Sequence, residues 1–217
     1  MECVDCQSLL CYRGDQEGFP GCPMEDRTIF DESLELLKED PILKFYQTSC
    51  RIESKGYGRW PRACEIIQFC KDMEYQTIGF AFCIGLKREA AIFNQLLKCA
   101  GFKTVSALCK SGGIPKEVLG LSDKDKVRPG RTEVICNPIA QALRLNQQKT
   151  DFNVVIGLCV GHDSLFYKYS EAPVTTLVTK DRRLGHNPVA ALYMSESGYL
   201  KEAFDEVMGE TVREDTR

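Results

Sequence analysis

From residue 75 onward, short apolar segments alternate with longer segments whose apolar positions recur with a helical period. The short segments are nearly continuous in apolar residues and rich in β-branched ones, which is typical of strands buried on both faces of a parallel sheet. We expect about five such strands, at residues 77–82, 103–108, 132–135, 153–158 and 174–179. The segments between them predict helices over residues 86–102, 137–148 and 164–169. The pattern therefore predicts an α/β fold, a parallel sheet with helices on both faces.

The chain before residue 75 follows a different pattern. Apolar positions such as Ile29, Leu34 and Leu37 form one stripe, and Pro41 and Pro61 mark a helix break and a helix start. The first residues, in contrast, are mostly Cys, Gly, Pro and charged residues without apolar period. The sequence predicts four parts. These are a Cys-rich metal-binding segment (residues 1–27), a helical segment packed on the core (28–74), an α/β domain (75–195) and a charged C-terminal tail (196–217).

Composition and charge narrow the class of protein. The 217 residues are 43% hydrophobic and 27% charged, which is ordinary for a globular protein. A net charge of −3 argues against a nucleic-acid partner, since such proteins usually carry a basic face. No apolar run approaches the length of a membrane span, and the N-terminus lacks the pattern of a secretory signal. We therefore expect a cytoplasmic protein without a membrane or nucleic-acid partner.

The twelve cysteines are informative in that setting. Cytosolic thiols are kept reduced, so metal binding or catalysis is favoured over a disulfide framework. Packing is the alternative, because a free cysteine is also a small apolar side chain. We assign packing to the cysteines on predicted helices, namely Cys50, Cys64, Cys70 and Cys99.

The first candidate site is the N-terminal set Cys3, Cys6, Cys11 and Cys22, with the spacing C-x2-C-x4-C-x10-C. Two residues between the first pair allow one turn to direct both sulfurs at the same centre. The segment has little apolar content to order it, so a bound metal would supply folding energy. Thiolate ligands are compatible with an iron–sulfur cluster and with zinc. The alternative is a disordered tail whose thiols bind nothing.

The second candidate site lies at the ends of predicted strands, where Cys83, Cys109, Cys136 and Cys159 fall. Ligands of open parallel sheets bind at the carboxyl ends of the strands. Polar residues accompany these cysteines, namely Lys110, Asn137, His162, Asp163, Lys180, Asp181, Arg182 and His186. The hypothesis is a second metal, cluster or ligand site made by the four cysteines and His162. Buried packing cysteines are the alternative.

Catalytic candidates come from the same edge. Cys159 would be a metal ligand or a nucleophile, His162 a ligand or a general acid and base, and Lys180 and Arg182 would hold an anionic group. Redox chemistry on a small molecule suits the sulfur ligands best. The alternative is a protein without catalytic activity.

The motifs CxxCxxxxC, FCIGL, CKSGG, CNPIAQA, GLCVGHDSLF, APVT and KDRRLGHNP occur in this order. By these motifs the chain resembles a bacterial and archaeal family, the domain of unknown function 1847, described as metal-binding. The resemblance implies a ligand role for Cys3, Cys6, Cys11 and Cys22. It also places Cys83, Cys109, Cys136, Cys159 and His162 within family motifs. Its association with anaerobes favours iron–sulfur over zinc.

Together these observations predict a metal-binding protein that carries an iron–sulfur cluster and has a Cys/His-lined site at the carboxyl edge of the sheet. Its expected partner is a small-molecule ligand or a redox protein. The alternative is a zinc-stabilised, non-catalytic binding or regulatory module.

Overall fold

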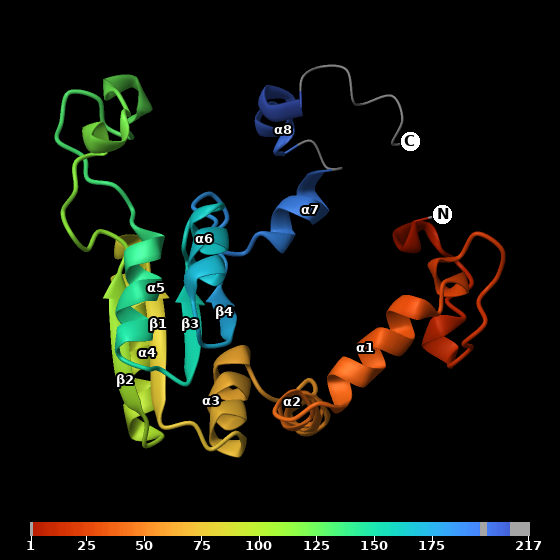
Figure 1. The fold of residues 1–217 in the computed structure, drawn as a ribbon. Coiled ribbons are helices and arrows are strands. Elements are labelled where there is room, and N and C mark those ends of the chain that lie inside the picture. Colours follow the sequence, from red (N-terminus) through yellow and green to blue (C-terminus); the bar gives the residue numbers. More distant parts are fainter. Residues whose placement is uncertain (1, 196–198, 209–217) are drawn as a thin grey trace. The chain divides into compact units, whose positions relative to one another are not determined.

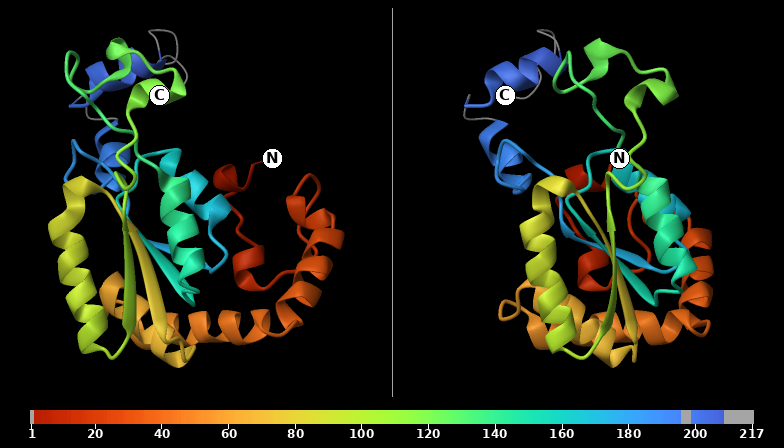
Figure 2. Two further views of the ribbon diagram at one scale, coloured as in Figure 1. Left: turned by 60° about the vertical axis from the view of Figure 1, so that its left-hand side comes forward. Right: turned by 90° about the vertical axis from the view of Figure 1, so that its left-hand side faces the viewer.

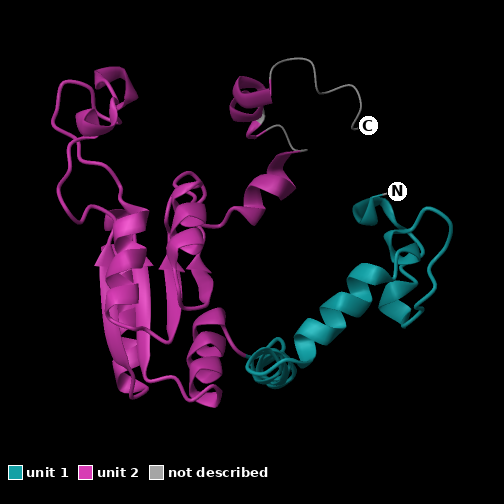
Figure 3. Cartoon of the chain, in the orientation of Figure 1, with its two compact units in different colours: residues 1–59 teal, residues 60–217 magenta. Residues whose placement is uncertain are grey.

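The computed structural model describes residues 2–195 and 199–208. The chain divides into two compact units, residues 1–59 and 60–217 (Figure 3). The sequence prediction placed the α/β domain at residue 75, whereas helix α3 (Arg62–Asp72) belongs to the second unit. Part of the expected C-terminal tail, residues 196–198 and 209–217, lies outside the described residues, and Lys201–Met208 form helix α8.

The first unit contains three short 3-10 turns followed by two helices that pack on each other. The turns are Cys3–Asp5, Cys11–Arg13 and Pro23–Glu25, and the helices are α1 (Thr28–Lys38) and α2 (Ile42–Gly56). The Asp26 carboxylate accepts the Thr28 N–H at 3.0 Å and so satisfies a free donor at the start of α1.

The second unit is built on a sheet of four parallel strands in the order β2-β1-β3-β4 (Figure 1). The strands are β1 (Thr77–Phe82), β2 (Lys103–Leu108), β3 (Phe152–Ile156) and β4 (Val174–Val178). Phe82 at the end of β1 pairs with Leu108 of β2 and with Ile156 of β3, so these three strands end at one edge. The α/β class and the parallel sheet are as predicted.

Helices cover both faces of the sheet (Figure 2). On one face, α5 (Pro138–Gln147) and α6 (His162–Tyr169) pack against small or branched strand residues such as Ala81 and Val155. On the other, α4 (Lys87–Cys99) and α3 contribute aromatic contacts, with ring centroids 6.2 Å apart for Phe80–Phe93 and 5.5 Å for Phe69–Phe152. Helix α7 (Val189–Ser195) follows β4. None of the helices in the described ranges combines the length and apolar character needed to cross a bilayer.

One of the five predicted strands, the third one at residues 132–135, is wrong. Val134 makes one isolated antiparallel bridge with Pro115 instead of joining the sheet. Proline has no N–H to donate, so a strand ladder cannot extend through it. Hydrogen bonds on either side, Lys116 N–H to the Glu133 carbonyl at 3.0 Å and Ile135 N–H to the Ile114 carbonyl at 2.8 Å, close the base of a long excursion between β2 and α5.

Candidate functional site

Two of the predicted site cysteines follow adjacent strands directly. The Cys109 N–H donates to the Phe82 carbonyl at 3.0 Å, and the Cys83 N–H donates to the Ile156 carbonyl at 3.2 Å. Side chains alternate along a strand, so Cys83 shares the face of Ala81, and Cys109 that of Ala107. All four are buried in the core beneath α5 and α6. The two thiols therefore lie side by side at the carboxyl edge, 8% and 2% exposed.

Cys136 reaches the same edge by another route. The backbone N–H of Asn137 donates to the Cys109 carbonyl at 2.8 Å, which holds the preceding Cys136 beside the end of β2. Asn137 also begins α5, because its side-chain oxygen accepts the Ala140 N–H at 2.9 Å. Gln141 of the same helix donates to the Ala107 and Phe82 carbonyls at 2.6 and 3.2 Å. The start of α5 is thus bonded to the ends of β1 and β2.

Cys83, Cys109 and Cys136 form a thiol cluster. The Cys109 side chain lies in hydrogen-bond contact with both of the others, and its sulfur accepts the Ile84 N–H at 3.3 Å. A thiol has one proton, so three contacting thiols share protons and titrate as one group. The contact with Cys109 lowers the pKa of Cys83 to about 4 and that of Cys136 to about 5, whereas it raises the pKa of Cys109, which keeps the last proton.

Basic side chains add to this effect. Lys180 hydrogen-bonds to Cys83 and further lowers the pKa of that thiol. Lys110 does the same for Cys136 and also donates to the Val134 carbonyl at 2.6 Å, and His162 lies near enough to Cys136 to act on it electrostatically. These neighbours stabilise thiolate, the form of cysteine that binds metals and attacks electrophiles.

Cys159 and His162 stand at the end of the next strand. The Cys159 sulfur accepts a hydrogen bond from the Arg182 guanidinium at 3.1 Å, which raises the pKa of the arginine. The Cys159 carbonyl accepts the His162 N–H at 2.9 Å, and Gly161, at φ +81°, makes the turn into α6. The buried Nδ1 of His162 has no hydrogen-bond partner among the described residues. His186 lies apart in a turn, where its Nδ1 accepts the Asp181 N–H at 3.1 Å.

Most of these side chains line one pocket of about 960 Å³, which we call the strand-end pocket. The predicted residues in its wall are Cys83, Lys110, Cys136, Cys159, His162, Lys180 and Arg182. Cys109 lies beneath them, in contact with two of the lining sulfurs. The structure therefore brings together all the residues proposed for the second site.

The four N-terminal cysteines, Cys3, Cys6, Cys11 and Cys22, line a separate pocket of about 420 Å³ within the first unit. Met24 and Phe30 contribute to its largely apolar wall. The Ser8 hydroxyl lies 3.4 Å from the Cys6 sulfur, and this hydrogen bond lowers the pKa of the thiol. The spacing of these residues in the sequence thus corresponds to one shared cavity.

Comparison with known proteins identifies the chain. The family described as "Protein of unknown function (DUF1847)" matches residues 22–177, more than two thirds of the sequence. The chain belongs to this family. It is also 42% identical to the uncharacterized protein MJ0455 of Methanocaldococcus jannaschii over 205 residues, 94% of this chain and 99% of the relative. No solved structure matches the chain.

The DUF1847 match bears differently on the two sites. It spans the thiol cluster, Cys159 and His162, together with Cys22. Cys3, Cys6 and Cys11 precede the matched residues, and Lys180 and Arg182 follow them. The relative from M. jannaschii aligns over a longer range, 94% of the chain. The predicted family membership is confirmed.

Neither group of cysteines has the arrangement of a completed metal site. In the part of the DUF1847 chain that the structure describes, no set of three or more Cys, His, Asp or Glu side chains is arranged around a common ion position. The strand-end sulfurs nevertheless touch, and thiol protons must leave before sulfur binds a metal. The donor set suits a thiophilic metal.

The remaining cysteines show where the packing interpretation fails. Cys70 of α3 is completely buried, as packing predicts. Cys50, Cys64 and Cys99 are exposed, so that interpretation is wrong for them. A helix presents side chains to solvent on one side, and cysteine is neither apolar nor polar enough to indicate which side it occupies.

Sequence reasoning missed part of the pocket wall. Arg128, Arg131 and Leu119 line the strand-end pocket from the long excursion between β2 and α5, and none of the three was predicted as a site residue. Its length was the available signal, since long loops in compact domains are often functional. The charged residues themselves gave no sign that they would face the cysteines.

Proposed function

We propose that this DUF1847 protein is a metalloprotein whose thiol cluster binds an iron–sulfur cluster and whose strand-end pocket holds a small molecule beside it. The proposal rests on one observation above all, the contact of the Cys109 thiol with both Cys83 and Cys136, three residues from separate parts of the chain. Three sulfurs linked through Cys109 at the edge where parallel sheets bind ligands suit a common thiophilic centre.

Cys70 provides an internal comparison with a packing cysteine. Burial and the charge of Asp151 raise the pKa of Cys70 to about 12, so it stays a neutral thiol. Cys83 is buried and Cys136 half-buried, yet contact with Cys109 lowers their pKa values to about 4 and about 5. A cysteine that only packs in a core gains nothing from a lowered thiol pKa, whereas metal binding needs thiolates.

The described residues offer ligands and proton-handling groups. Cys83, Cys109 and Cys136 would hold the metal centre, with Cys159 or His162 as a further ligand. If His162 is not a ligand, we assign proton transfer to its imidazole, which lines the pocket and has a buried Nδ1 without a partner among the described residues. Lys180 and Arg182 would bind an anionic group of the small molecule. An iron–sulfur cluster supplies electron transfer or Lewis acidity at such a position.

The N-terminal cysteines are proposed as a second metal site. Cys3, Cys6, Cys11 and Cys22 share one cavity, and the first three 3-10 turns bury no side chain. A segment with so little core is the kind that a metal stabilises outright. Iron–sulfur and zinc both accept four sulfur ligands. The alternative is that zinc binds the N-terminal cysteines and no metal binds in the strand-end pocket. The protein would then be a zinc-stabilised binding or regulatory module.

Metal analysis of protein purified without oxygen tests the proposal. Iron, zinc and acid-labile sulfide are measured per chain, together with the visible absorption spectrum. We expect iron and sulfide in similar amounts and a coloured protein. Zinc alone, in a colourless protein, would overturn the iron–sulfur assignment and favour the binding module. Protein with neither metal would contradict metal binding at both sites.

A further inference from the structure

Residues 116–133 form a lobe at the rim of the strand-end pocket. Its base is closed by backbone hydrogen bonds, including Lys116 N–H to the Glu133 carbonyl at 3.0 Å. Two short turns, Lys116–Leu119 and Asp123–Asp125, give it internal structure. Compact loops whose ends lie close together and that are packed by their own side chains frequently carry function.

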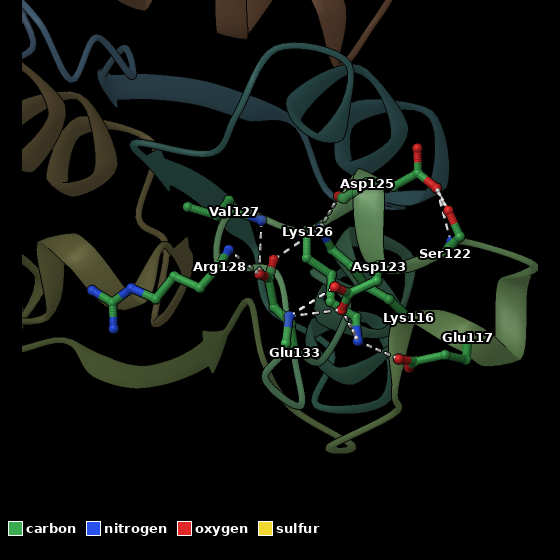
Figure 4. A network of polar contacts seen from close by, with 10 residues as sticks. Lys116, Glu117, Ser122, Asp123, Asp125, Lys126, Val127, Arg128 and Glu133 are labelled. Carbon is green, nitrogen blue, oxygen red and sulfur yellow. Dashed lines mark hydrogen bonds and ion pairs between the residues drawn. The ribbon is translucent and has the colours of Figure 1, made fainter.

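Ion pairs hold the interior of the lobe (Figure 4). Lys126, only 8% exposed at its side chain, contacts Glu117 at 2.6 Å and Asp123 at 3.2 Å. The Asp123 carboxylate also accepts the Gly130 N–H at 2.8 Å. Ser122 and Asp125 bond to each other at the start of the second turn. The lobe is therefore ordered by polar contacts, with little help from an apolar core.

Glu133 joins the lobe to the pocket. Its carboxylate lies 2.8 Å from Lys116 and accepts the Val127 N–H at 2.9 Å. It also accepts the Arg128 N–H at 3.4 Å, which fixes the backbone from which that arginine projects. The Arg128 side chain extends away from the network (Figure 4) and lines the strand-end pocket with Arg131. Neither guanidinium forms an ion pair with a carboxylate within the described ranges.

The charge of the pocket wall opposes that of the chain. The whole chain carries a net charge of −3, yet six lysines and arginines line the wall, and Glu133, which is already paired with Lys116, is its sole carboxylate among the described residues. The basic residues fall into two groups, Lys110, Lys180 and Arg182 beside the sulfurs and Lys116, Arg128 and Arg131 on the lobe, where Lys116 is already paired with Glu133. Apolar side chains, Leu119 and Leu121 among them, line the space as well.

We propose that the strand-end pocket binds a small organic dianion. One anionic group is held by Lys180 and Arg182 beside the thiol cluster, and the other by Arg128 and Arg131 of the lobe. The ligand has a carbon framework between two carboxylate or phosphate groups, since a pocket of about 960 Å³ accommodates a small organic molecule and is partly apolar. Arginine binds both kinds of anion through paired hydrogen bonds. The inference names the ligand class of the proposed function, but the anion contacts require no metal.

Calorimetric titration with two probes tests the inference, inorganic pyrophosphate for phosphates and succinate for dicarboxylates. The wild type is compared with the lobe variant Arg128→Gln/Arg131→Gln and with the charge-matched control Arg88→Gln/Arg144→Gln, whose arginines are exposed on α4 and α5. We expect at least one probe to bind the wild type and the control equally. Binding to the lobe variant should be weaker by about tenfold or more, because two charge-assisted contacts are lost. The preferred probe identifies the anion.

Two results would overturn the inference, namely no binding of either probe to the wild type, or equal binding to the lobe variant and the control. Metal content measured on the same preparations distinguishes failure of the dianion site from failure of the proposed metal site. Metal-free protein that binds a probe through the lobe arginines supports the dianion site and contradicts the metal site. Metal-loaded protein that binds neither probe supports the metal site and contradicts the dianion site.

Discussion

The backbone N–H of Asn137 donates to the carbonyl of Cys109 across 2.8 Å, and this hydrogen bond carries Cys136 to the end of β2. The same residue begins α5 through its side-chain oxygen. The start of α5 and the placement of the thiol cluster therefore both depend on Asn137. Since the Gln141 side chain also bonds α5 to the ends of β1 and β2, hydrogen bonds to the strand backbone hold the cluster in place.

Replacing Asn137 by Ala should therefore weaken the fold at this point. The substitution removes the helix cap and is expected to lower the free energy of unfolding by about 1 kcal/mol. Asn137→Asp is the control, because a carboxylate oxygen can still accept the Ala140 N–H. Urea unfolding followed by circular dichroism measures both variants. Equal stability of Asn137→Ala and Asn137→Asp would show that the cap contributes nothing.

The strands around this edge were largely predictable from sequence, and the reasons are local. β1, β2, β3 and β4 are short apolar runs flanked by turn residues, and their length and β-branched or aromatic residues favour strands over buried helices. Residues 132–135 have the same local pattern but pair with Pro115, and the long-range contact decides the outcome. Local periodicity carries no information about which partner a segment finds.

The cysteines of the candidate site could also be predicted from the sequence, but the arginines of the lobe could not. Cys83, Cys109 and Cys159 follow real strands, so the rule about carboxyl ends of parallel strands placed them correctly. Cys136 arrives at the same edge although no strand precedes it, because Asn137 bonds to Cys109. Arg128 and Arg131 were missed, since their position depends on the fold of the lobe, which is set by side-chain contacts such as Lys126 with Asp123.

Gly157, which follows β3, should be intolerant of substitution. It adopts φ +64°, and a Cβ added there would lie 1.9 Å from a methyl group of the buried Leu86. Gly113→Ala is a matched control, because Gly113 has φ +60° and no atom within 4 Å of an added Cβ. Both variants bear the backbone strain, and Gly157→Ala should lose roughly a further 1–3 kcal/mol in urea unfolding from overpacking.

The difference between these two glycine variants is the informative quantity. If Gly157→Ala is no less stable than Gly113→Ala, Leu86 moves aside freely, and the close packing between β3 and the turn after β1 is not a constraint on the edge.

The lobe should lose order in acid. Hydrogen bonding from the Gly130 N–H, followed by the contact with Lys126, lowers the pKa of Asp123 below its ordinary value of 3.8. A group whose pKa is lower in the folded state stabilises that state fully above its ordinary pKa and loses the contribution as the pH falls through the folded pKa. The hydrogen-exchange protection factor of the Gly130 amide should therefore fall in this acidic range.

Asp123→Asn provides the control for this pH dependence, since it keeps an acceptor oxygen but has no charge to lose. Its Gly130 protection should start lower and vary less with pH over the same range. A wild-type lobe whose protection stays constant through the acidic range, or falls just as it does in Asp123→Asn, would contradict a role for the Asp123 charge.

The most direct test of the central claim is the metal content of Cys109→Ser compared with Cys99→Ser and Cys6→Ser, all purified without oxygen. Cys99 is exposed on α4, so its variant should keep the wild-type metal content. Cys109→Ser should lose the share bound at the thiol cluster and keep the N-terminal share, and Cys6→Ser should do the reverse. Wild-type metal content in Cys109→Ser would show that the contacting thiols at the sheet edge hold no metal.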